Sequence, residues 1–338
     1  MNKELLTLRV IEILTSAGFM LSDRCNTRPR SFDLAARSNR ILLLLRTLSN
    51  IDSLNAVAAH EMRSLSDHLN GKPLIIGSKS RSQMLEDGVT YFRHGIPSIN
   101  SATLHDCLIE GVPPLVRAAP GGLCISIDGE RLRSIRIERK ISLGELATKL
   151  GMSRRTISRY EGGMMAASVD VALRLEEVLD VELICPVKIF ASTLDDRIRR
   201  ANQDGDSGDG RRDAQSDCRM DDQMGDKNEV SLILAPLGFI VFPAKQAPFN
   251  AISDDDKHNT MLTGINTYNR TMVRNAHLMS SISCVAKTRS LYIVKGNCRH
   301  THIDGTVLIR ESELGKISDH DDVIQLIHER STDKEAEL

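Results

Sequence analysis

The sequence lacks the features that mark secreted and membrane proteins. Its 7 cysteines are scattered and form no Cys-x-x-Cys pair, which argues against a disulfide framework and against a zinc ribbon. No stretch reaches the length of a membrane-spanning helix without charged residues, and the amphipathic start is unlike a cleavable signal. We therefore expect a soluble, cytoplasmic protein with reduced thiols and no membrane contact.

An excess of charge is also lacking. The 338 residues include 44 Lys and Arg against 45 Asp and Glu, a net charge of −1, so the whole chain is not a general binder of polyanions. Basic charge must therefore be local. Residues 128–163 meet this condition, because nine basic residues stand against five acidic ones there and give a local net charge of +4. The chain length predicts two or three domains.

Residues 142–163, SLGELATKLGMSRRTISRYEGG, predict two short helices joined by a tight turn. Ser142 and Glu145 have the spacing of a capping box, so the first helix begins at Ser142. Gly151 can adopt the left-handed conformation that ends this helix, and Ser153 can cap the second. The pattern is that of a helix-turn-helix, whose second helix lies in the major groove of double-stranded DNA.

The two faces of the second helix differ in chemistry. Ile157 and Tyr160 face inward at helical spacing, whereas arginine and hydroxyl side chains face outward. Helix N-termini favour phosphate, so the two capping serines join this outer face as candidate DNA contacts. The predicted DNA-binding residues are Ser142, Ser153, Arg154, Arg155, Thr156, Ser158 and Arg159.

ELATKLGMSRRTISRYEGG resembles the lambda-repressor-like, or Cro-type, helix-turn-helix family. The resemblance implies that Arg136, on the preceding helix, forms a structural pair with Glu161 at the end of the recognition helix. It also implies that Arg154 and Arg155 approach base edges, with Arg159 close to a base or a phosphate.

Two more helices complete the predicted bundle. Asp128 is expected to cap the first helix, and residues 168–180 are expected to form the fourth. The side chains expected to pack from the fourth helix are Val169, Ala172, Leu173, Leu175, Val178 and Leu179. A helical pair with a basic face can also be a solvated surface or a protein-contact module. The capping pattern, the turn glycine and the Tyr-Glu-Gly ending coincide here, and together they favour DNA binding.

Residues 1–112 predict an α/β domain. Apolar spacing indicates helices over 5–17, 53–70 and 101–110, and strands over 19–21, 31–36, 41–48, 73–77, 89–92 and 96–99. This order resembles the restriction-endonuclease-like fold. Active members of that superfamily hold Mg²⁺ with an Asp near the second strand and an acid-x-Lys triplet on the third.

Asp33 has the place of the first acid in that pattern. The triplet, however, falls on Leu44-Leu45-Arg46, so the second carboxylate is missing. One carboxylate is a poor Mg²⁺ site. We therefore expect no catalytic residue and no metal or other cofactor, with Asp33 and Arg46 forming a stabilising pair.

The remaining segments are read from composition. Residues 111–122 are expected to connect the α/β domain to the Cro-type domain over 123–190, with a strand over 123–127. Residues 194–229 are polar and predict a disordered linker. The two histidines at 300 and 302 are expected to be solvated.

Residues 230–330 predict a second, degenerate α/β domain that weakly repeats the first. In this repeat Asn250 replaces Asp33, and Gly264 lies near the counterpart of Arg46. The segments expected to correspond are GFIVFPAKQAPFNAIS and GFMLSDRCNTRPRSFDLAA, MLTGI and LLLLR, SLYIV and PLIIG, and IDGTVLI and EDGVTYF.

The whole chain, with its parts in this order, resembles an archaeal family of HTH-type transcriptional regulators. TRPRSFDLAAR, EGVPPLV and SRRTISRYEGGM carry much of the resemblance. It implies a sequence-specific, DNA-binding transcriptional regulator. We expect a homodimer, because one unit of this kind reads only a few base pairs. We expect no enzyme, because the second acid is missing at Leu44. The transcription machinery is a further expected partner. Two alternatives stay open: a nuclease targeted by the helix-turn-helix, and a protein-interaction scaffold such as a transcriptional coactivator.

Overall fold

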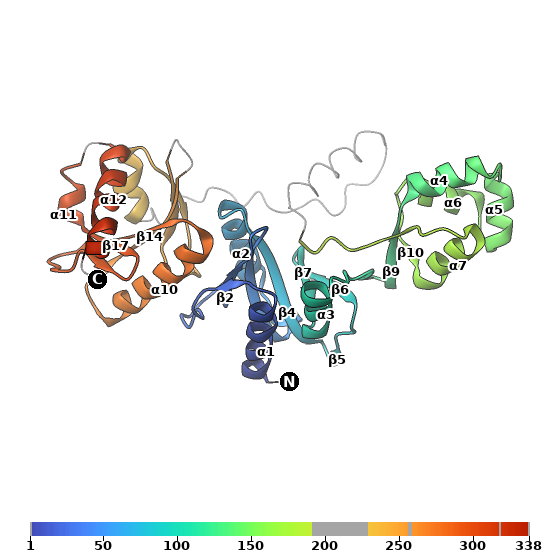
Figure 1. The fold of residues 1–338 in the computed structure, drawn as a ribbon, viewed down its shortest axis with the longest axis horizontal. Coiled ribbons are helices and arrows are strands. Elements are labelled where there is room, and N and C mark those ends of the chain that lie inside the picture. Colours follow the sequence, from blue (N-terminus) through green and yellow to red (C-terminus); the bar gives the residue numbers. More distant parts are fainter. Residues whose placement is uncertain (1, 191–228, 256–258, 318, 337–338) are drawn as a thin grey trace. The chain divides into compact units, whose positions relative to one another are not determined.

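The computed structural model describes residues 2–190, 229–255, 259–317 and 319–336 (Figure 1). Contacts divide the chain into two compact units. The first comprises Met1–Gly18, Thr47–Asn55 and Leu74–Ile189, and the second comprises Phe19–Arg46, Ala56–Pro73 and Phe190–Leu338. The linker expected over 194–229 lies outside the described residues, except for Glu229, where a helix begins. Each described helix is too short or too polar to cross a lipid bilayer.

The first α/β region is a mixed sheet with helices, as the sequence predicts. Its main elements are α1 (Lys3–Ser16), β1 (Met20–Leu21), β2 (Leu34–Arg37), β3 (Leu42–Asn50), α2 (Ala56–His68), β4 (Lys72–Ser80), β6 (Val89–Arg93) and β7 (Ile96–Ile99). The strand order is β1-β2-β3-β4-β7-β6. β1, β2 and β3 are antiparallel neighbours, whereas β4 and β7 are parallel.

β2 and β3, in the segments where strands are expected over 31–36 and 41–48, pair as a hairpin. Leu34 lies opposite Leu45, and the Ser38 N–H donates to the Ile41 carbonyl across the turn at 2.9 Å. Leu42 to Leu45 are each at most 1% exposed. A strand that is buried on both faces needs such a continuous apolar run, which explains the sequence ILLLL.

Two segments differ from the prediction. The helix expected over 101–110 is α3 (Ser101–His105) followed by a wider π turn over Asp106–Glu110. The expected connector over 111–122 contains a strand, β8 (Val116–Ala119), which pairs with β6 and with β9 (Gly122–Ile127). The prolines and glycines at the ends of this segment favoured a loop, although the four residues between them form a strand that pairs with its neighbours.

The second α/β region repeats the strand order of the first. Its elements are α9 (Glu229–Leu234), β12 (Ile240–Pro243), β13 (Ala251–Asp254), β14 (Thr260–Thr267), α10 (Arg270–Ala286), β15 (Arg289–Lys295), β16 (His302–Ile303), β17 (Thr306–Arg310), α11 (Glu311–Leu314) and α12 (His320–Ala336). The order β12-β13-β14-β15-β17-β16 matches β1-β2-β3-β4-β7-β6. The predicted internal repeat is therefore present in the topology.

Backbone hydrogen bonds fix the correspondence of the two copies. The Asp33 N–H donates to the Leu45 carbonyl at 2.7 Å, and the Asn250 N–H donates to the Thr263 carbonyl at 2.8 Å. Asn250 thus has the place of Asp33, and Gly264, the residue after Thr263, has the place of Arg46. This part of the predicted alignment is confirmed.

The predicted match of IDGTVLI with EDGVTYF is wrong. Its strand β17 is parallel to β15 and antiparallel to β16, which are the relations that β7 has to β4 and β6. IDGTVLI therefore corresponds to the β6–β7 hairpin, residues 93–99. The shared Asp-Gly letters favoured the wrong segment, whereas the true counterpart of Asp304, His94, shares only a left-handed backbone with φ of 49° in both residues.

The helix-turn-helix bundle contains four helices. They are α4 (Gly129–Glu138), α5 (Leu143–Leu150), α6 (Arg154–Glu161) and α7 (Val169–Leu179), and the short strands β10 (Ala167–Ser168) and β11 (Ile184–Cys185) pair with β9. Leu146, Ile157 and Leu175 are fully buried in its core. Leu173 is 53% exposed, so its predicted packing role is wrong. The buried face of α7 is set by Ala172, Leu175 and Leu179, and Leu173 falls outside it.

Close backbone packing sets the position of α6 against α4. A Cβ atom on Gly129 would lie 2.3 Å from the Tyr160 carbonyl oxygen and 2.5 Å from that of Glu161. Any side chain at this position would separate the start of α4 from the end of α6. Because both obstacles are backbone atoms, no side-chain rotation can relieve the clash.

We expect Gly129→Ala to loosen α6, because the bundle must open to admit the methyl group. The expected cost is roughly 1–3 kcal/mol, as for other overpacked sites. Amide hydrogen exchange of residues 154–161 in the full chain should become faster. Gly315→Ala is the matched control, since the nearest atom to its Cβ lies at 3.7 Å and its φ of −63° suits alanine. Unchanged exchange in Gly129→Ala would contradict this account of the packing.

Candidate nucleic-acid interface

The N-terminus of α5 is held by a complete capping box. The Glu145 N–H donates to Ser142 Oγ at 3.1 Å, and the Ser142 N–H donates to Glu145 Oε2 at 2.7 Å. The backbone hydrogen bond from Ser142 is the main cause of a lowered pKa of the Glu145 carboxyl group. Gly151 ends the helix with a φ of 68°. The predicted start and end of α5 are therefore confirmed.

The recognition helix α6 begins at a second cap. Ser153 Oγ accepts a hydrogen bond from the Thr156 N–H at 3.0 Å, and the two hydroxyl groups lie 2.8 Å apart. Ile157 is fully buried and Tyr160 is 5% exposed, so these two side chains anchor the inner face. Thr156 is half-buried, and its hydroxyl is already occupied by the cap.

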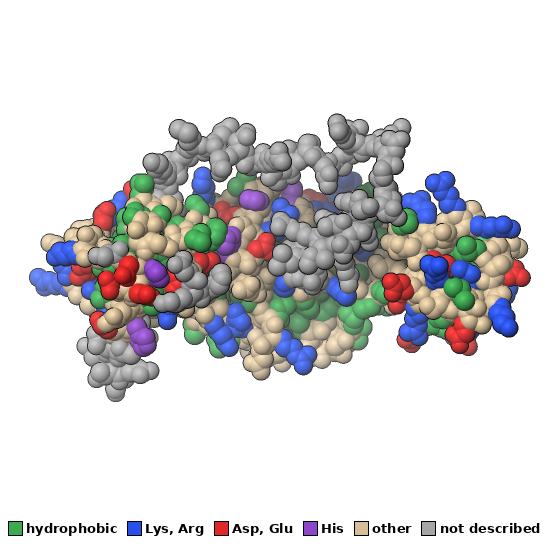
Figure 2. Space-filling view, turned by 90° about the horizontal axis from the view of Figure 1, so that it is seen from above, with side chains coloured by type: hydrophobic (Ala, Val, Ile, Leu, Met, Phe, Trp, Pro, Cys, Tyr) green, Lys and Arg blue, Asp and Glu red, His purple; other side chains and the backbone are tan. Residues whose placement is uncertain are grey.

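The arginines of α6 lie on the outer face of the bundle. Arg154, Arg155 and Arg159 are exposed, as is Ser158 between them. Among the described residues none of the three arginines forms an ion pair, so their guanidinium groups are available to an external anion. Figure 2 shows Lys and Arg side chains projecting from this bundle, with fewer Asp and Glu side chains between them.

Arg154 lies across the first turn of α5. A Cβ atom on Gly144 would be 2.9 Å from Arg154 Nε and 3.0 Å from its Nη2. Only a glycine at position 144 leaves this space to the guanidinium group. The guanidinium therefore lies beside the capped start of α5, where backbone N–H groups favour a phosphate. The sequence offered no direct signal for this contact.

Arg136 joins three parts of the bundle. Its Nε and Nη2 donate to the two carboxylate oxygens of Glu161 at 2.5 and 3.0 Å, and its Nη1 donates to the Ile141 carbonyl at 3.1 Å. The hydrogen bonds to Glu161 are the main cause of a raised pKa of Arg136. Both side chains are largely buried, at 12% and 8% exposure. The fork therefore ties α4, the α4–α5 connection and the end of α6 together.

The first α/β region has an ion cluster where the superfamily pattern places its metal. Asp33 Oδ1 lies 2.6 Å from Arg30 Nε, and Oδ2 lies 3.9 Å from Arg46 Nε. Arg46 Nη1 also donates to the Arg30 carbonyl at 2.6 Å. The pair of Asp33 and Arg46 that the sequence predicts is therefore present, but Arg30 is the nearer partner. The position of Arg30, three residues before Asp33, could have indicated this ion pair from the sequence.

This donor set does not fit Mg²⁺. The ion takes oxygen ligands. Among the described residues the ion pairs of this cluster contain one carboxylate, that of Asp33, which faces two guanidinium groups. Leu44, at the place of the second acid, is fully buried. Cys25 is buried beside the cluster, and burial, with Asp33 as the next cause, raises the pKa of its thiol to about 12.

The corresponding place in the second α/β region is filled by neutral groups. Asn250 Oδ1 accepts a hydrogen bond from the Ile265 N–H at 2.9 Å. A Cβ atom on Gly264 would lie 2.6 Å from the ring of Tyr292, which is 1% exposed. The tyrosine ring thus occupies the space that a side chain at position 264 would need. At this place the described residues of neither copy present a pair of carboxylates.

Two family models match the chain in separate regions. A "PD-(D/E)XK superfamily domain" matches residues 3–114, and a "Helix-turn-helix" model matches residues 132–184. These matches confirm the expected nuclease-like fold of the first region and the Cro-type fold of the bundle. The presence of a nuclease-like fold does not by itself show an activity.

Solved structures similar to the chain include the restriction-modification controller protein C.AhdI from Aeromonas hydrophila, at 33% identity and a TM-score of 0.16. That match covers 16% of this chain and 82% of the other. A complex of the SinR and SinI proteins is 27% identical with the same TM-score, and covers 24% of this chain and 84% of the other.

Archaeal relatives match the chain over nearly its full length. A protein of Methanococcoides burtonii named "Putative HTH-type transcriptional regulatory protein" is 47% identical over 98% of both chains. Proteins of the same description from Methanosarcina barkeri and Natronomonas pharaonis are 46% and 42% identical, and each match covers 98% of this chain and at least 98% of the relative. The chain therefore belongs to this archaeal family of HTH-type transcriptional regulatory proteins.

Proposed function

We propose that the chain regulates transcription by binding a specific sequence of double-stranded DNA through α6. The observation that carries this proposal is the outer face of α6, where three exposed arginines have no ion-pair partner among the described residues. The inner face is anchored by Ile157 and Tyr160, and the Arg136–Glu161 fork holds its end. A short helix fixed in this way can present its first residues to the major groove.

The contacts divide into base reading and positioning. Arg154 and Arg155 are proposed to reach base edges, where arginine pairs best with the O6 and N7 acceptors of guanine. Ser142 and Ser153 stand at the two helix N-termini and are proposed to lie against phosphates, with Thr156 and Ser158 beside them. Arg159, one turn further along, is assigned to a base or a phosphate.

We further propose that the chain binds as a homodimer. One recognition helix reads only a few base pairs, so adjacent half-sites about 10 base pairs apart would give the required specificity. The bundle also exposes three large apolar side chains, Ile137 at 56%, Met164 at 73% and Leu173 at 53%. Contacts with the transcription machinery would follow DNA binding and are part of the same proposal.

The nuclease-like regions are proposed to be structural. A salt-bridged Asp33 in one copy, and Asn250 with a packed Tyr292 in the other, leave neither copy with the oxygen ligands that Mg²⁺-dependent cleavage needs. The alternative, a nuclease directed by the helix-turn-helix, has the fold in its favour but not these donor sets.

We expect Arg154→Ala and Arg155→Ala to weaken binding to the cognate duplex by roughly 1–3 kcal/mol, with little change on scrambled DNA. Both duplexes should be measured at one fixed salt concentration. Arg174→Ala, an exposed arginine on α7, is the matched control and should change neither affinity. Arg136→Ala should lower binding to both duplexes, because it releases Glu161 and the end of α6. Equal losses on both duplexes for Arg154→Ala and Arg155→Ala would mean that these arginines only hold the DNA backbone.

Gly144→Ala tests the resting place of Arg154. The added methyl group should displace the guanidinium from α5 and weaken cognate binding, while leaving the fold intact because only a flexible side-chain end must move. In a double-mutant cycle the same change should have almost no effect in the Arg154→Ala background, since the two residues act through one contact. Additive losses would show that Gly144 acts independently of Arg154.

The chain is expected not to hydrolyse DNA when Mg²⁺ or Mn²⁺ is added to the cognate duplex. The measurement is nicking of supercoiled plasmid that carries the binding site, with Asp33→Ala and Asp304→Ala compared in parallel. Asp304 is an exposed acid paired with His277 outside both nuclease-like places. Metal-dependent nicking that is lost in Asp33→Ala and kept in Asp304→Ala would establish the nuclease alternative.

A further inference from the structure

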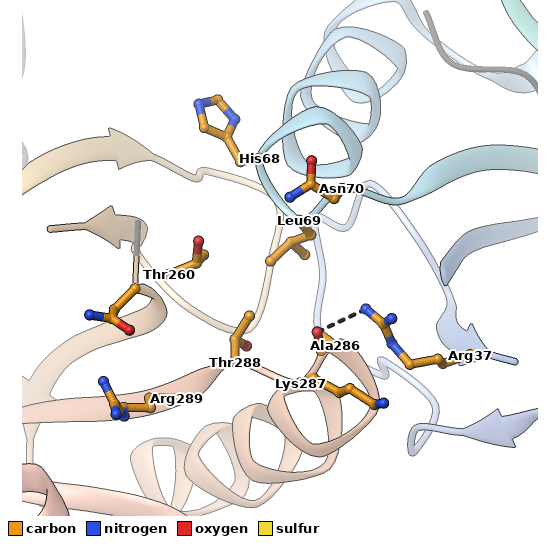
Figure 3. Close-up of a pocket in the computed structure, with 10 residues that line it drawn as sticks. Arg37, His68, Leu69, Asn70, Thr260, Ala286, Lys287, Thr288 and Arg289 are labelled. Atoms are coloured by element: carbon orange, nitrogen blue, oxygen red, sulfur yellow. Dashed lines mark hydrogen bonds between the residues drawn. The ribbon is translucent and has the colours of Figure 1, made fainter. Parts of the chain in front are cut away.

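A polar cavity of about 550 Å³ lies within the second unit (Figure 3). It is formed by the end of β2, the end of α2, the start of β14 and the connection between α10 and β15. Its volume is within the range of small-molecule sites, which is roughly 300–1,000 Å³. The cavity is remote in sequence from the recognition helix and has no part in the DNA contacts proposed above.

The charge of the lining is positive. Arg37, Lys287 and Arg289 contribute cations, and no carboxylate occurs among the described lining residues. The buried carboxylate of Asp255 is close in sequence, but it is bound by Asn259, whose N–H and Nδ2 donate to it at 2.7 and 2.6 Å. An anion that enters the cavity would meet cations without displacing an internal acid of this lining.

The C-terminus of α10 borders the cavity and would ordinarily repel an anion. Its carbonyls are all engaged, however. The Lys287 and Thr288 N–H groups donate to the Cys284 and Ser283 carbonyls at 3.3 and 3.0 Å. Arg37 donates to the Val285 and Ala286 carbonyls at 2.6 and 2.9 Å, and the second of these bonds is drawn in Figure 3. Arg37 therefore offsets the helix end, and Lys287 and Arg289 remain to bind a ligand.

Two buried donors at the cavity lack an acceptor. Thr288 Oγ1 and Arg289 Nη1 are shielded from solvent and form no hydrogen bond within the described chain. Buried polar atoms of this kind are rarely left unsatisfied in a folded protein. Both groups can donate, and a guanidinium prefers an anionic oxygen. An acceptor that carries negative charge would therefore satisfy both donors.

We propose that this cavity binds a small phosphate-bearing metabolite, with the phosphate held by Lys287, Thr288 and Arg289. A phosphate-bearing ligand offers several oxygens, which suits donors spaced along the lining. Figure 3 shows Lys287 and Arg289 extending to opposite sides of Thr288. The cavity is larger than a single phosphate group, and its polar lining suits a hydroxyl-rich remainder such as a sugar. The site would give the regulator a small-molecule input.

The test uses the full chain and sodium pyrophosphate as the probe, titrated by calorimetry at low ionic strength. Saturable binding is expected. Arg289→Gln and Lys287→Asn should each weaken it about tenfold or more, because each removes a charge-assisted hydrogen bond. Lys287 has a φ of 57°, and asparagine tolerates this conformation, so Lys287→Asn keeps the turn and protects the test against misfolding. Thr288→Val, which removes only the hydroxyl, should weaken binding less.

Arg274→Gln is the matched control, since Arg274 is exposed on α10 and does not line the cavity. It should bind pyrophosphate like the unaltered chain. Absence of saturable binding, an equal loss in Arg274→Gln, or equal binding of citrate would each overturn the assignment to phosphate. If pyrophosphate does not bind but Lys287→Asn weakens the affinity for non-specific duplex DNA, the cavity is a nucleic-acid contact and the proposal fails.

Discussion

The position of the recognition helix depends on the buried fork between Arg136 and Glu161. α6 has only 8 residues, and an isolated helix of this length is unstable in water. It is stabilised by tertiary contacts: Ile157 and Tyr160 on one face, Gly129 against its last carbonyls, and the fork at its end. A buried charge that loses its partner is strongly destabilising. The helix end is therefore most stable where Glu161 meets Arg136. The outer arginines thus stand on a helix whose orientation is fixed.

A second ion cluster has the opposite consequence in the nuclease-like region. Where the superfamily pattern would place a metal, Arg30 and Arg46 compensate Asp33 directly. The buried acid is therefore neutralised without a metal ion. Burial lowers the pKa of Arg46, and the negative charge of Asp33 partly offsets this effect. In the second copy an amide and a tyrosine ring fill the same place without charge. The two regions reach stability by different chemistry on one topology.

Local signals predicted the bundle well and long-range relations less well. The capping box, the turn at Gly151 and the inner pair of Ile157 and Tyr160 depend on neighbours in sequence, so spacing alone revealed them. β8 was missed because its pairing with β6 and β9 is decided by tertiary context. The DNA-contact residues stay a prediction, since exposure and charge show only that they are available. Contacts such as that of Arg154 with Gly144 join separate helices and leave no pattern in the sequence.

The wrong match of IDGTVLI shows what the two copies share. The β6–β7 and β16–β17 hairpins agree in strand direction and in the position of a left-handed residue, but their amino-acid sequences differ. The same holds where α2 and α10 end: Asn70 and Lys287 have φ of 50° and 57°, and each is followed by a strand with a basic residue near its start. The backbone conformation of the turn therefore recurs, while the side chain at its left-handed position is neutral in one copy and charged in the other. A left-handed turn constrains φ but does not require one particular side chain. Only the second turn adds Lys287 and Thr288 to its basic residue. The residues proposed to bind phosphate therefore occur in one copy, on a turn whose backbone both copies share.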